Sequence, residues 1–384
     1  MHTADIVVIG GGIAGVSVAA ALTASGLGVA LVEMEPTLAF HTTGRSAAQY
    51  LKNYGNDVVR RLTIASAEYF SDSPDGTKLW APRPLLQVAA TEQAASLRAE
   101  VASSLALAPA TQFLDGDESR SLVPVLSPEV AGSLYEPDAM ELDVAAIHHS
   151  FVGELRAGGG TVQLANPVVA LSYTSNWIVT LADGSTIETP VVVNAAGAWG
   201  DQVASLAGID PVPLHPRRRT VAVASVPDEI DPSSWPLIAF LDREGTMEAY
   251  CKAEPGGLLV SPADESPSQP CDARPEEVDV ARGIDTLNRW TTLAVRHVTT
   301  TWAGLRTFAA DRSPVAGYGA GAPGFFWFVG QGGYGIQMAP GLARVAAALV
   351  VDGAIPGDLA DVGLSAADLS PTRAGLGGPL VADH

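Results

Sequence analysis

The first part of the chain alternates between short apolar runs and a helical repeat. Residues 5–9 and 29–32 form apolar runs, the pattern of buried parallel strands. Between them, residues 16–23 carry Ala, Val and Leu at helical spacing, and Gly26 follows as a cap. A strand, a helix and a strand in this order predict a right-handed β-α-β unit whose two strands are parallel.

Further along, the pattern changes to short strands that alternate with helices. Residues 161–183 and 186–193 are read as a strand, a hairpin and a strand. Residues 219–226, 237–241, 247–252 and 257–260 are read as antiparallel strands, and residues 325–329 as a further apolar strand. Helices are predicted at residues 51–72, 91–106, 144–157, 276–290 and 337–351. Residues 263–275 are rich in Ser, Pro, Asp and Glu, which predicts a solvated loop, and the tail from residue 365 is expected to be loosely held.

Composition narrows the class of protein. The chain has 384 residues, of which 47% are apolar and 17% charged, enough for a large core in two lobes or more. Its net charge of −20 argues against nucleic-acid binding and against a polybasic membrane anchor. Two cysteines, Cys251 and Cys271, fit neither a disulfide framework nor a metal site. Without an apolar run long enough to span a membrane and without a basic leader, a cytoplasmic location is expected.

A glycine-rich turn follows the first strand. Gly10, Gly12 and Gly15 form a G-x-G-x-x-G run at the start of the helix, and Glu33 ends the second strand 23 residues after Gly10. In such a turn the glycines allow a tight bend, close approach of a pyrophosphate to backbone N–H groups, and close packing of helix and strand. The acidic residue accepts hydrogen bonds from a ribose. This pattern predicts a dinucleotide site for NAD or FAD.

The far end of the chain favours FAD. The apolar strand at 325–329 runs into a second glycine-rich turn at 330–335, which opens the helix at 337–351. A helix N-terminus there suits the flavin edge that gains negative charge on reduction. Residues 194–199, Asn-Ala-Ala-Gly-Ala-Trp, form a third turn of this kind. In nicotinamide dehydrogenases the chain does not need to return to the first glycine-rich nucleotide site near its C-terminal end.

Several segments together resemble the D-amino-acid oxidase superfamily of flavoproteins, and within it the bacterial D-arginine dehydrogenases. The matching segments are residues 41–50, 82–84, 194–199, 216–220, 301–306 and 331–337, so the resemblance covers nearly the whole chain. It implies a two-lobed α/β (α+β) fold with a Rossmann-like FAD-binding domain and an antiparallel-sheet substrate domain. The FAD-binding domain would comprise residues 1–80, 141–210 and 297–384, and the substrate domain residues 81–140 and 211–296.

The resemblance also implies non-covalent FAD. The cysteine that tethers the flavin in related sarcosine oxidases is missing from residues 306–340, and His41, near the tethering histidine of dimethylglycine-type relatives, is interpreted as a loop residue. The expected cofactor-binding residues are Gly10, Gly12, Ile13, Ala14, Gly15, Glu33, Met34, Thr43, Gly44, Arg45, Ser46, Ala47, Ala48, Val168, Gly197, Gly332, Tyr334, Gly335, Ile336 and Gln337.

A carboxylate-binding site is expected around two arginines. A guanidinium offers the bidentate fork that suits a substrate carboxylate. By resemblance, Arg219, Arg306, Tyr54 and Tyr250 bind the carboxylate, and the carbonyl of Gly333 accepts a hydrogen bond from the substrate amine.

The pocket departs from that of the D-arginine dehydrogenases at three positions. Leu85 replaces a glutamate that pairs with the substrate guanidinium, Gln49 replaces a histidine and Leu51 a threonine. An aliphatic wall favours apolar groups and leaves a buried cation without a partner. Uncharged, apolar substrates are therefore expected, unless Glu248, which shares a strand face with Tyr250, supplies a replacement anion. A solvated charge on the hairpin is the favoured interpretation of Glu248.

The predicted function is FAD-dependent oxidative deamination of D-amino acids to 2-oxo acids and ammonia. Two alternatives stay open: a secondary-amine oxidase of the glycine or sarcosine type, and a catalytically quiet flavoprotein subunit of an electron-transfer complex. The electron acceptor, whether oxygen, a quinone or another compound, is left open by the sequence.

Overall fold

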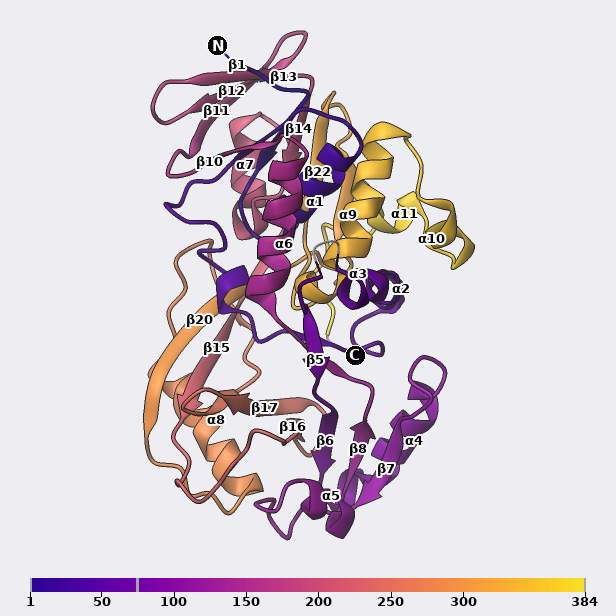
Figure 1. Ribbon diagram of the computed structural model, residues 1–384, viewed down its shortest axis with the longest axis vertical. Helices are drawn as coiled ribbons and strands as arrows, with labels where there is room; N and C mark the ends of the chain where they lie inside the picture. Colours follow the sequence, from indigo (N-terminus) through magenta and orange to yellow (C-terminus); the bar gives the residue numbers. More distant parts are fainter. Residues whose placement is uncertain (1, 74–75, 383–384) are drawn as a thin grey trace.

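A six-stranded sheet forms the centre of the first lobe. The structure, a computed structural model, describes residues 2–73 and 76–382 and shows two lobes along its long axis (Figure 1). The sheet has the order β10 (Thr161–Gln163), β3 (Val29–Val32), β2 (Ile6–Ile9), β14 (Val191–Asn194), β22 (Phe325–Val329) and β21 (Val315–Tyr318). Only β21 runs antiparallel to its neighbour. The predicted parallel β-α-β unit is therefore confirmed.

Helices cover one face of this sheet and a smaller sheet covers the other. Residues of α1 (Ile13–Ala24), α2 (Asp57–Ala65), α6 (Val144–Ala157) and α9 (Gly335–Val351) share a core with Ile6 and Val8. The other face, with Val7 and Ile9, packs against β11 (Val168–Tyr173), β12 (Trp177–Leu181), β13 (Thr186–Thr189) and α7 (Gly200–Leu206). β1 (His2–Thr3) completes the four-stranded sheet with β11–β13. Burial on both faces explains the unbroken apolar runs of β2 and β3.

A nine-stranded, mostly antiparallel sheet forms the second lobe. Its order is β19 (Ser266–Pro267), β15 (His215–Ala224), β18 (Gly257–Ser261), β17 (Met247–Glu254), β16 (Leu237–Leu241), β6 (Leu85–Ala89), β8 (Gly132–Glu136) and β7 (Gln112–Asp115), with β20 (Val298–Phe308) also paired to β15. One face packs on α8 (Glu277–Trp290). The other face is turned toward the first lobe, and Leu97 of α4 (Ala94–Ser104) packs against it.

Short elements connect the two lobes. β4 (Gln49–Tyr50), β9 (Met140–Leu142) and β5 (Trp80–Pro82) form a three-stranded sheet, and β5 lies between the two lobes (Figure 1). Glu141 of β9 accepts from Arg83 Nε at 2.8 Å and pairs with Lys252 of β17. The remaining helical elements are η1 (Thr43–Arg45), η2 (Thr91–Gln93), η3 (Gly197–Trp199), α3 (Ala67–Ser71), α5 (Gly116–Leu122), α10 (Gly357–Asp361) and α11 (Ala366–Leu369).

The two-lobed α/β architecture is as predicted, with three local corrections. The helix expected at 51–72 is two helices, α2 and α3, and α2 begins only after Asn56, whose side chain accepts from Val59 N. The tail is held rather than loose, because Leu369 is fully buried and the Arg373 guanidinium binds the Asp311 carboxylate. Residues 263–275 form β19 and part of a cavity wall rather than a solvated loop.

The pairing of β20 bears on the predicted division into domains. All of β20 lies within the segment 297–384 that was assigned to the FAD-binding domain, yet β20 pairs along its length with β15 of the nine-stranded sheet. Residues 298–308 thus extend the second sheet, and the return to the first lobe comes after Phe308. Among the described residues, no helix combines the length and apolar character needed to cross a bilayer.

Candidate active site

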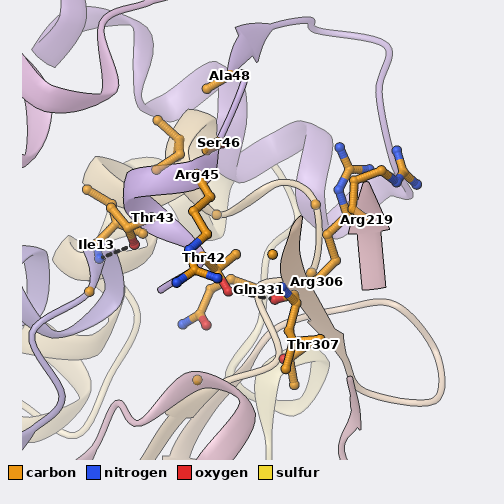
Figure 2. A pocket seen from close by; sticks show the side chains of 18 of the residues that line it. Ile13, Thr42, Thr43, Arg45, Ser46, Ala48, Arg219, Arg306, Thr307 and Gln331 are labelled. Atoms are coloured by element: carbon orange, nitrogen blue, oxygen red, sulfur yellow. Dashed lines mark hydrogen bonds between the residues drawn. The ribbon is translucent and has the colours of Figure 1, made fainter. Parts of the chain in front are cut away.

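One cavity of about 1110 Å³ reaches both glycine-rich turns and the inner face of the nine-stranded sheet. Figure 2 shows its central part, where Arg219 and Arg306 lie across from Thr43, Arg45 and Ser46. The cavity therefore brings together segments from the beginning, the middle and the end of the chain.

The first glycine turn has the close contacts that require glycine. Gly10 has φ +113°, and a Cβ there would lie 2.5 Å from the carbonyl oxygen of Ala195. A Cβ on Gly15 would lie 1.8 Å from the carbonyl oxygen of Gly10, so helix α1 packs directly on the turn. Gly12 caps α1 without a side-chain hydrogen bond. The positive end of the helix dipole is thus presented to the cavity, as phosphate binding requires.

Side chains from other segments hold this turn in place. Glu33, directly after β3, accepts from Gly11 N at 2.6 Å, which places its carboxylate at the turn. Thr43 Oγ1 accepts from Ile13 N at 3.0 Å, a contact drawn in Figure 2. His148 Nε2 lies 3.0 Å from the carbonyl oxygen of Gly11, and burial lowers the pKa of its imidazole. Because a lowered pKa favours the neutral imidazole, His148 adds no charge beside the positive N-terminal end of α1.

The second glycine turn joins β22 to α9. Gly332 has φ +57°, and its N–H donates to the carbonyl of Thr307 at 2.8 Å, which fixes the turn against the end of β20. Two buried polar atoms nearby, Thr307 Oγ1 and Gln337 Nε2, have no hydrogen-bond partner in the described part of the chain. Both residues line the cavity. Unpaired buried groups of this kind fit a polar cofactor, because leaving them unsatisfied costs free energy.

Most of the expected cofactor-binding residues line the cavity. Those that do are Gly10, Gly12, Ile13, Ala14, Glu33, Met34, Thr43, Arg45, Ser46, Ala47, Ala48, Val168, Gly197, Gly332, Gly335, Ile336 and Gln337. Gly15, Gly44 and Tyr334 lie behind the wall. A Cβ on Gly44 would lie 2.3 Å from the carbonyl oxygen of Ala39, and Tyr334 packs edge-on against Tyr54. These three shape the wall rather than face the cavity.

Arg306 is partly buried and lines the cavity. Its Nη1 donates to Tyr54 Oη at 3.3 Å, and no carboxylate lies within ion-pairing distance in the described residues. Burial opposes its charge, but the neighbouring Tyr54, Tyr250 and Glu265 outweigh burial and raise the pKa of the guanidinium. Arg306 is therefore a permanent cation in the wall of the cavity whose ionic partner is absent from the described chain.

Arg219 lies near Arg306 because β15 and β20 pair. Arg219 is opposite Gly304, two residues from Arg306, so both side chains project from one face. Arg219 Nε donates to the carbonyl of Asp264 at 2.8 Å, and Nη2 lies 3.4 Å from Glu265 Oε1. Arg218 points to the other face, where it pairs with Glu276 and Asp279.

Glu265 links two arginines in the wall. Its Oε2 accepts from Arg312 Nη2 at 2.6 Å, while Oε1 faces Arg219. Burial raises the pKa of a carboxyl, but here Arg312 and Arg219 outweigh burial and lower the pKa of Glu265. The ionised Glu265 orients Arg219 and offsets part of the positive charge.

Two tyrosines border the arginines. The Tyr54 hydroxyl accepts a hydrogen bond from Arg306, and the ring of Tyr250 lies 6.0 Å from Arg219 Cζ. Burial would raise the pKa of the Tyr250 hydroxyl, but Arg306 and Arg219, with a hydrogen bond from Ser261, hold it below its usual value. Gly333 lies against Arg306, since a Cβ there would be 2.8 Å from Nη1. The structure thus brings all five predicted catalytic residues together.

The predicted pocket residues separate into two groups. Gln49, Leu51 and Leu85 line the cavity. Leu85 forms an apolar band with Leu134, Leu237 and Leu241, all on one face of the sheet. Glu248 does not line it: its carboxylate accepts from Arg289 Nη2 at 2.6 Å. The idea that Glu248 supplies a pocket anion is therefore wrong, because α8 neutralises it outside the cavity.

Sequence reasoning missed several residues of the wall. Glu265 lies in the segment expected to be solvated, and Arg312 and Thr307 lie outside every recognised motif. Glu136 ends β8 and also lines the cavity, although it is only 4% exposed. The sequence around Glu136 offered one signal of a functional position, namely a charged residue at the end of an otherwise apolar strand.

The comparisons with known proteins agree with this geometry. Residues 5–349 match the family described as FAD dependent oxidoreductase (DAO). A Xenopus laevis protein named FAD-dependent oxidoreductase domain-containing protein 1 is 29% identical over 52% of this chain, which spans only 39% of that relative. One of the subunits of opine oxidase from Rhizobium meliloti is 21% identical, covering 94% of this chain and 96% of the relative.

Solved structures show the same fold. L-proline dehydrogenase from P. horikoshii superposes with a TM-score of 0.80 at 20% identity, covering 92% of this chain and 94% of that one. The cofactor of the matched family is FAD, and the two glycine turns, Glu33 and the unpaired Thr307 and Gln337 fit it.

Proposed function

Since the chain belongs to the FAD-dependent oxidoreductase family, we propose that it oxidises D-amino acids to 2-oxo acids and ammonia. The observation that carries the proposal is Arg306, a partly buried cation at the cavity wall that has no carboxylate within ion-pairing distance in the described chain. A free amino acid supplies that partner in its own carboxylate. A charged, bidentate pair of this kind forms readily with a guanidinium.

The chain's own groups fix the position of the substrate. Arg306 and Arg219 receive the carboxylate, Tyr54 and Tyr250 donate or accept beside it, and the Gly333 carbonyl accepts from the amine. Glu265 keeps Arg219 in place. Bound FAD supplies the chemistry by accepting the hydride from the substrate Cα. Holding that carbon in a reactive orientation is the main task left to the protein.

The configuration and the side chain of the substrate follow from separate features. The D configuration is supported by the resemblance of residues 41–50, 216–220 and 301–306 to D-amino-acid-oxidising flavoproteins. The apolar band of Leu85, Leu134, Leu237 and Leu241 suits the aliphatic part of a side chain nearest to Cα. A cytoplasmic location is part of the same proposal.

A second candidate is a flavoprotein subunit that acts only within a larger complex. It is favoured by the likeness, over nearly the whole chain, to a relative that is named as one subunit of an oxidase. Such a subunit would hold FAD without being reduced by an amino acid alone.

Anaerobic reduction of the purified protein separates these candidates. We expect the flavin absorbance near 450 nm to bleach with D-amino acids and to stay unchanged with their L enantiomers, glycine and N-methylglycine. Bleaching by N-methylglycine or glycine instead would identify a secondary-amine or glycine oxidase. A flavin that no amino acid reduces would indicate the subunit.

A further inference from the structure

Glu136 is a buried carboxylate in the cavity wall without a cationic partner. Glu136 is the last residue of β8 and is only 4% exposed. Its carboxylate lines the cavity and forms no ion pair within 4.0 Å among the described residues. Asn53 hydrogen-bonds it, Lys52 lies farther off, and Asp138 adds a like charge. Burial raises the pKa of its carboxyl, and Asn53 and Lys52 offset this only in part. An ionised carboxylate that is buried without an ion pair costs free energy, unless a ligand with a positive charge pairs with it.

The pairing of the strands places Glu136 beside the apolar band. Leu237 of β16 is opposite Leu85 of β6, and Leu85 is opposite Glu136 of β8. Directly paired residues share a face of the sheet, so these three side chains form a row on the cavity side. Glu136 thus lies one strand beyond Leu85.

A parallel row leads from the carboxylate site to the same region. Tyr250 is opposite Ala239, Ala239 is opposite Gln87, and Gln87 is opposite Leu134. Strands are about 4.8 Å apart, so Gln87 lies roughly 10 Å across the sheet from Tyr250, and Glu136, one strand farther on, roughly 14 Å. The small Ala239 between them leaves room above the sheet. Gln87 Nε2 donates to Glu100 Oε2 at 3.0 Å, which adds an acidic group at the exposed rim.

The dimensions fit an extended side chain. An aliphatic stem of four or five bonds reaches about 5–6 Å from Cα. With the carboxylate at Arg306 and Arg219, such a stem runs along the band of Leu85 and Leu237 toward Glu136. The ion-pair contact and the side chain of Glu136 itself span the rest of the distance. Glu248 plays no part, because Arg289 already neutralises it.

We propose that Glu136 determines substrate specificity by pairing with a positively charged group at the end of an aliphatic side chain. This inference rests on the proposed function, and it replaces the expectation of uncharged substrates that was based on Leu85 alone. The band receives the stem, and Glu136 receives the charge. Since the contact is remote from the reacting carbon, it acts mainly on KM.

The test compares two substrates of nearly equal length, D-lysine and D-norleucine, which differ by the terminal ammonium. For the unmodified enzyme we expect kcat/KM to be at least about tenfold higher with D-lysine. Glu136→Gln should lower kcat/KM for D-lysine by at least about thirtyfold, mostly through KM, and leave D-norleucine within about threefold. Glu248→Gln, which removes a carboxylate outside the cavity, is the matched control and should change neither.

Each result of this comparison either supports or refutes the proposed role of Glu136. Preference of the unmodified enzyme for D-norleucine refutes the role of Glu136 while leaving amino-acid oxidation intact, and this measurement needs no variant to fold. Equal loss with both substrates in Glu136→Gln also refutes it, since a structural defect acts on both. If neither substrate reduces the flavin and no other D-amino acid does, the proposed function itself fails, and this inference fails with it.

Discussion

The Arg306 guanidinium lies directly against the backbone of Gly333. A Cβ on Gly333 would approach Nη1 to 2.8 Å and Cζ to 3.0 Å, so no side chain fits there unless Arg306 moves. The glycine turn and the carboxylate site are therefore one unit: the turn that begins α9 also fixes the depth of the cation. This contact explains why Gly333, whose φ is not in the left-handed region, is nevertheless glycine.

Gly333→Ala should therefore weaken catalysis without loss of the cofactor. Displacement of Arg306 by a fraction of an ångström to about 1 Å is expected to lower kcat/KM by about ten- to a hundredfold, since misplaced substrates react poorly. Steady-state kinetics and the ratio of flavin to protein absorbance check this. Gly153→Ala, where a Cβ meets no atom within 4 Å, is the control and should behave as the unmodified enzyme.

Arg306→Met should abolish carboxylate recognition. The loss of a desolvated charged pair is worth roughly 3 kcal/mol, so kcat/KM should fall by at least about a hundredfold while FAD stays bound. Lysine should rescue only in part, because it offers a point charge instead of a fork. Arg218→Met is the matched control: it removes an arginine on the opposite face that pairs with α8, and is expected to affect stability rather than KM. Near-normal kinetics of Arg306→Met would refute the carboxylate site.

Local patterns were sufficient to predict the β-α-β unit of the first lobe. The apolar runs of β2 and β3, the glycines at 10, 12 and 15 and the acid at 33 each have a strict local requirement, and each is found in its expected place. The β20 strand was harder to assign, because its partner β15 lies far earlier in the chain and the sequence near residue 298 does not encode that pairing.

The polar residues of the cavity wall could be predicted only where a motif included them. Arg219 and Arg306 belong to recognisable segments, whereas Glu265 and Glu136 owe their positions to strand pairing and loop packing. A carboxylate in a polar segment such as 263–275 usually lies in water. Glu248 shows the reverse case: alternation along β17 predicted that it shares the face of Tyr250, but the pairing of β16 and β17 is irregular there, and its carboxylate pairs with Arg289 of α8.

The cofactor should be released when the protein is denatured in acid. The two cysteines, Cys251 and Cys271, are not in the cavity wall, so neither can tether FAD. Intact FAD in the supernatant, identified by mass spectrometry, is the expected result. Flavin that stays with the precipitated chain would point to His41, which lines the cavity and whose Nδ1 is buried without a partner in the described residues. His41→Ala would then release it.

Stability should depend on Glu141 in a defined range of pH. Burial alone would raise the pKa of this carboxyl, but Lys252 and Arg83 outweigh it, so the folded-state pKa lies below the ordinary 4.5. A carboxyl with a lowered pKa stabilises the fold fully above its unfolded-state pKa and loses that contribution as pH falls through the folded value. Glu141→Gln should therefore lower the free energy of unfolding most at neutral pH.

The difference between Glu141→Gln and the unmodified protein should shrink as the pH falls below about 4.5. Urea unfolding, with FAD at one saturating concentration, measures it at about pH 7 and about pH 4. Asp358→Asn, which breaks an exposed pair with Arg344, should cost little at either pH. A constant difference across this range would mean that Glu141 contributes through shape and hydrogen bonding alone. In that case the ionic link among Arg83, Glu141 and Lys252 would not stabilise the junction of the two lobes.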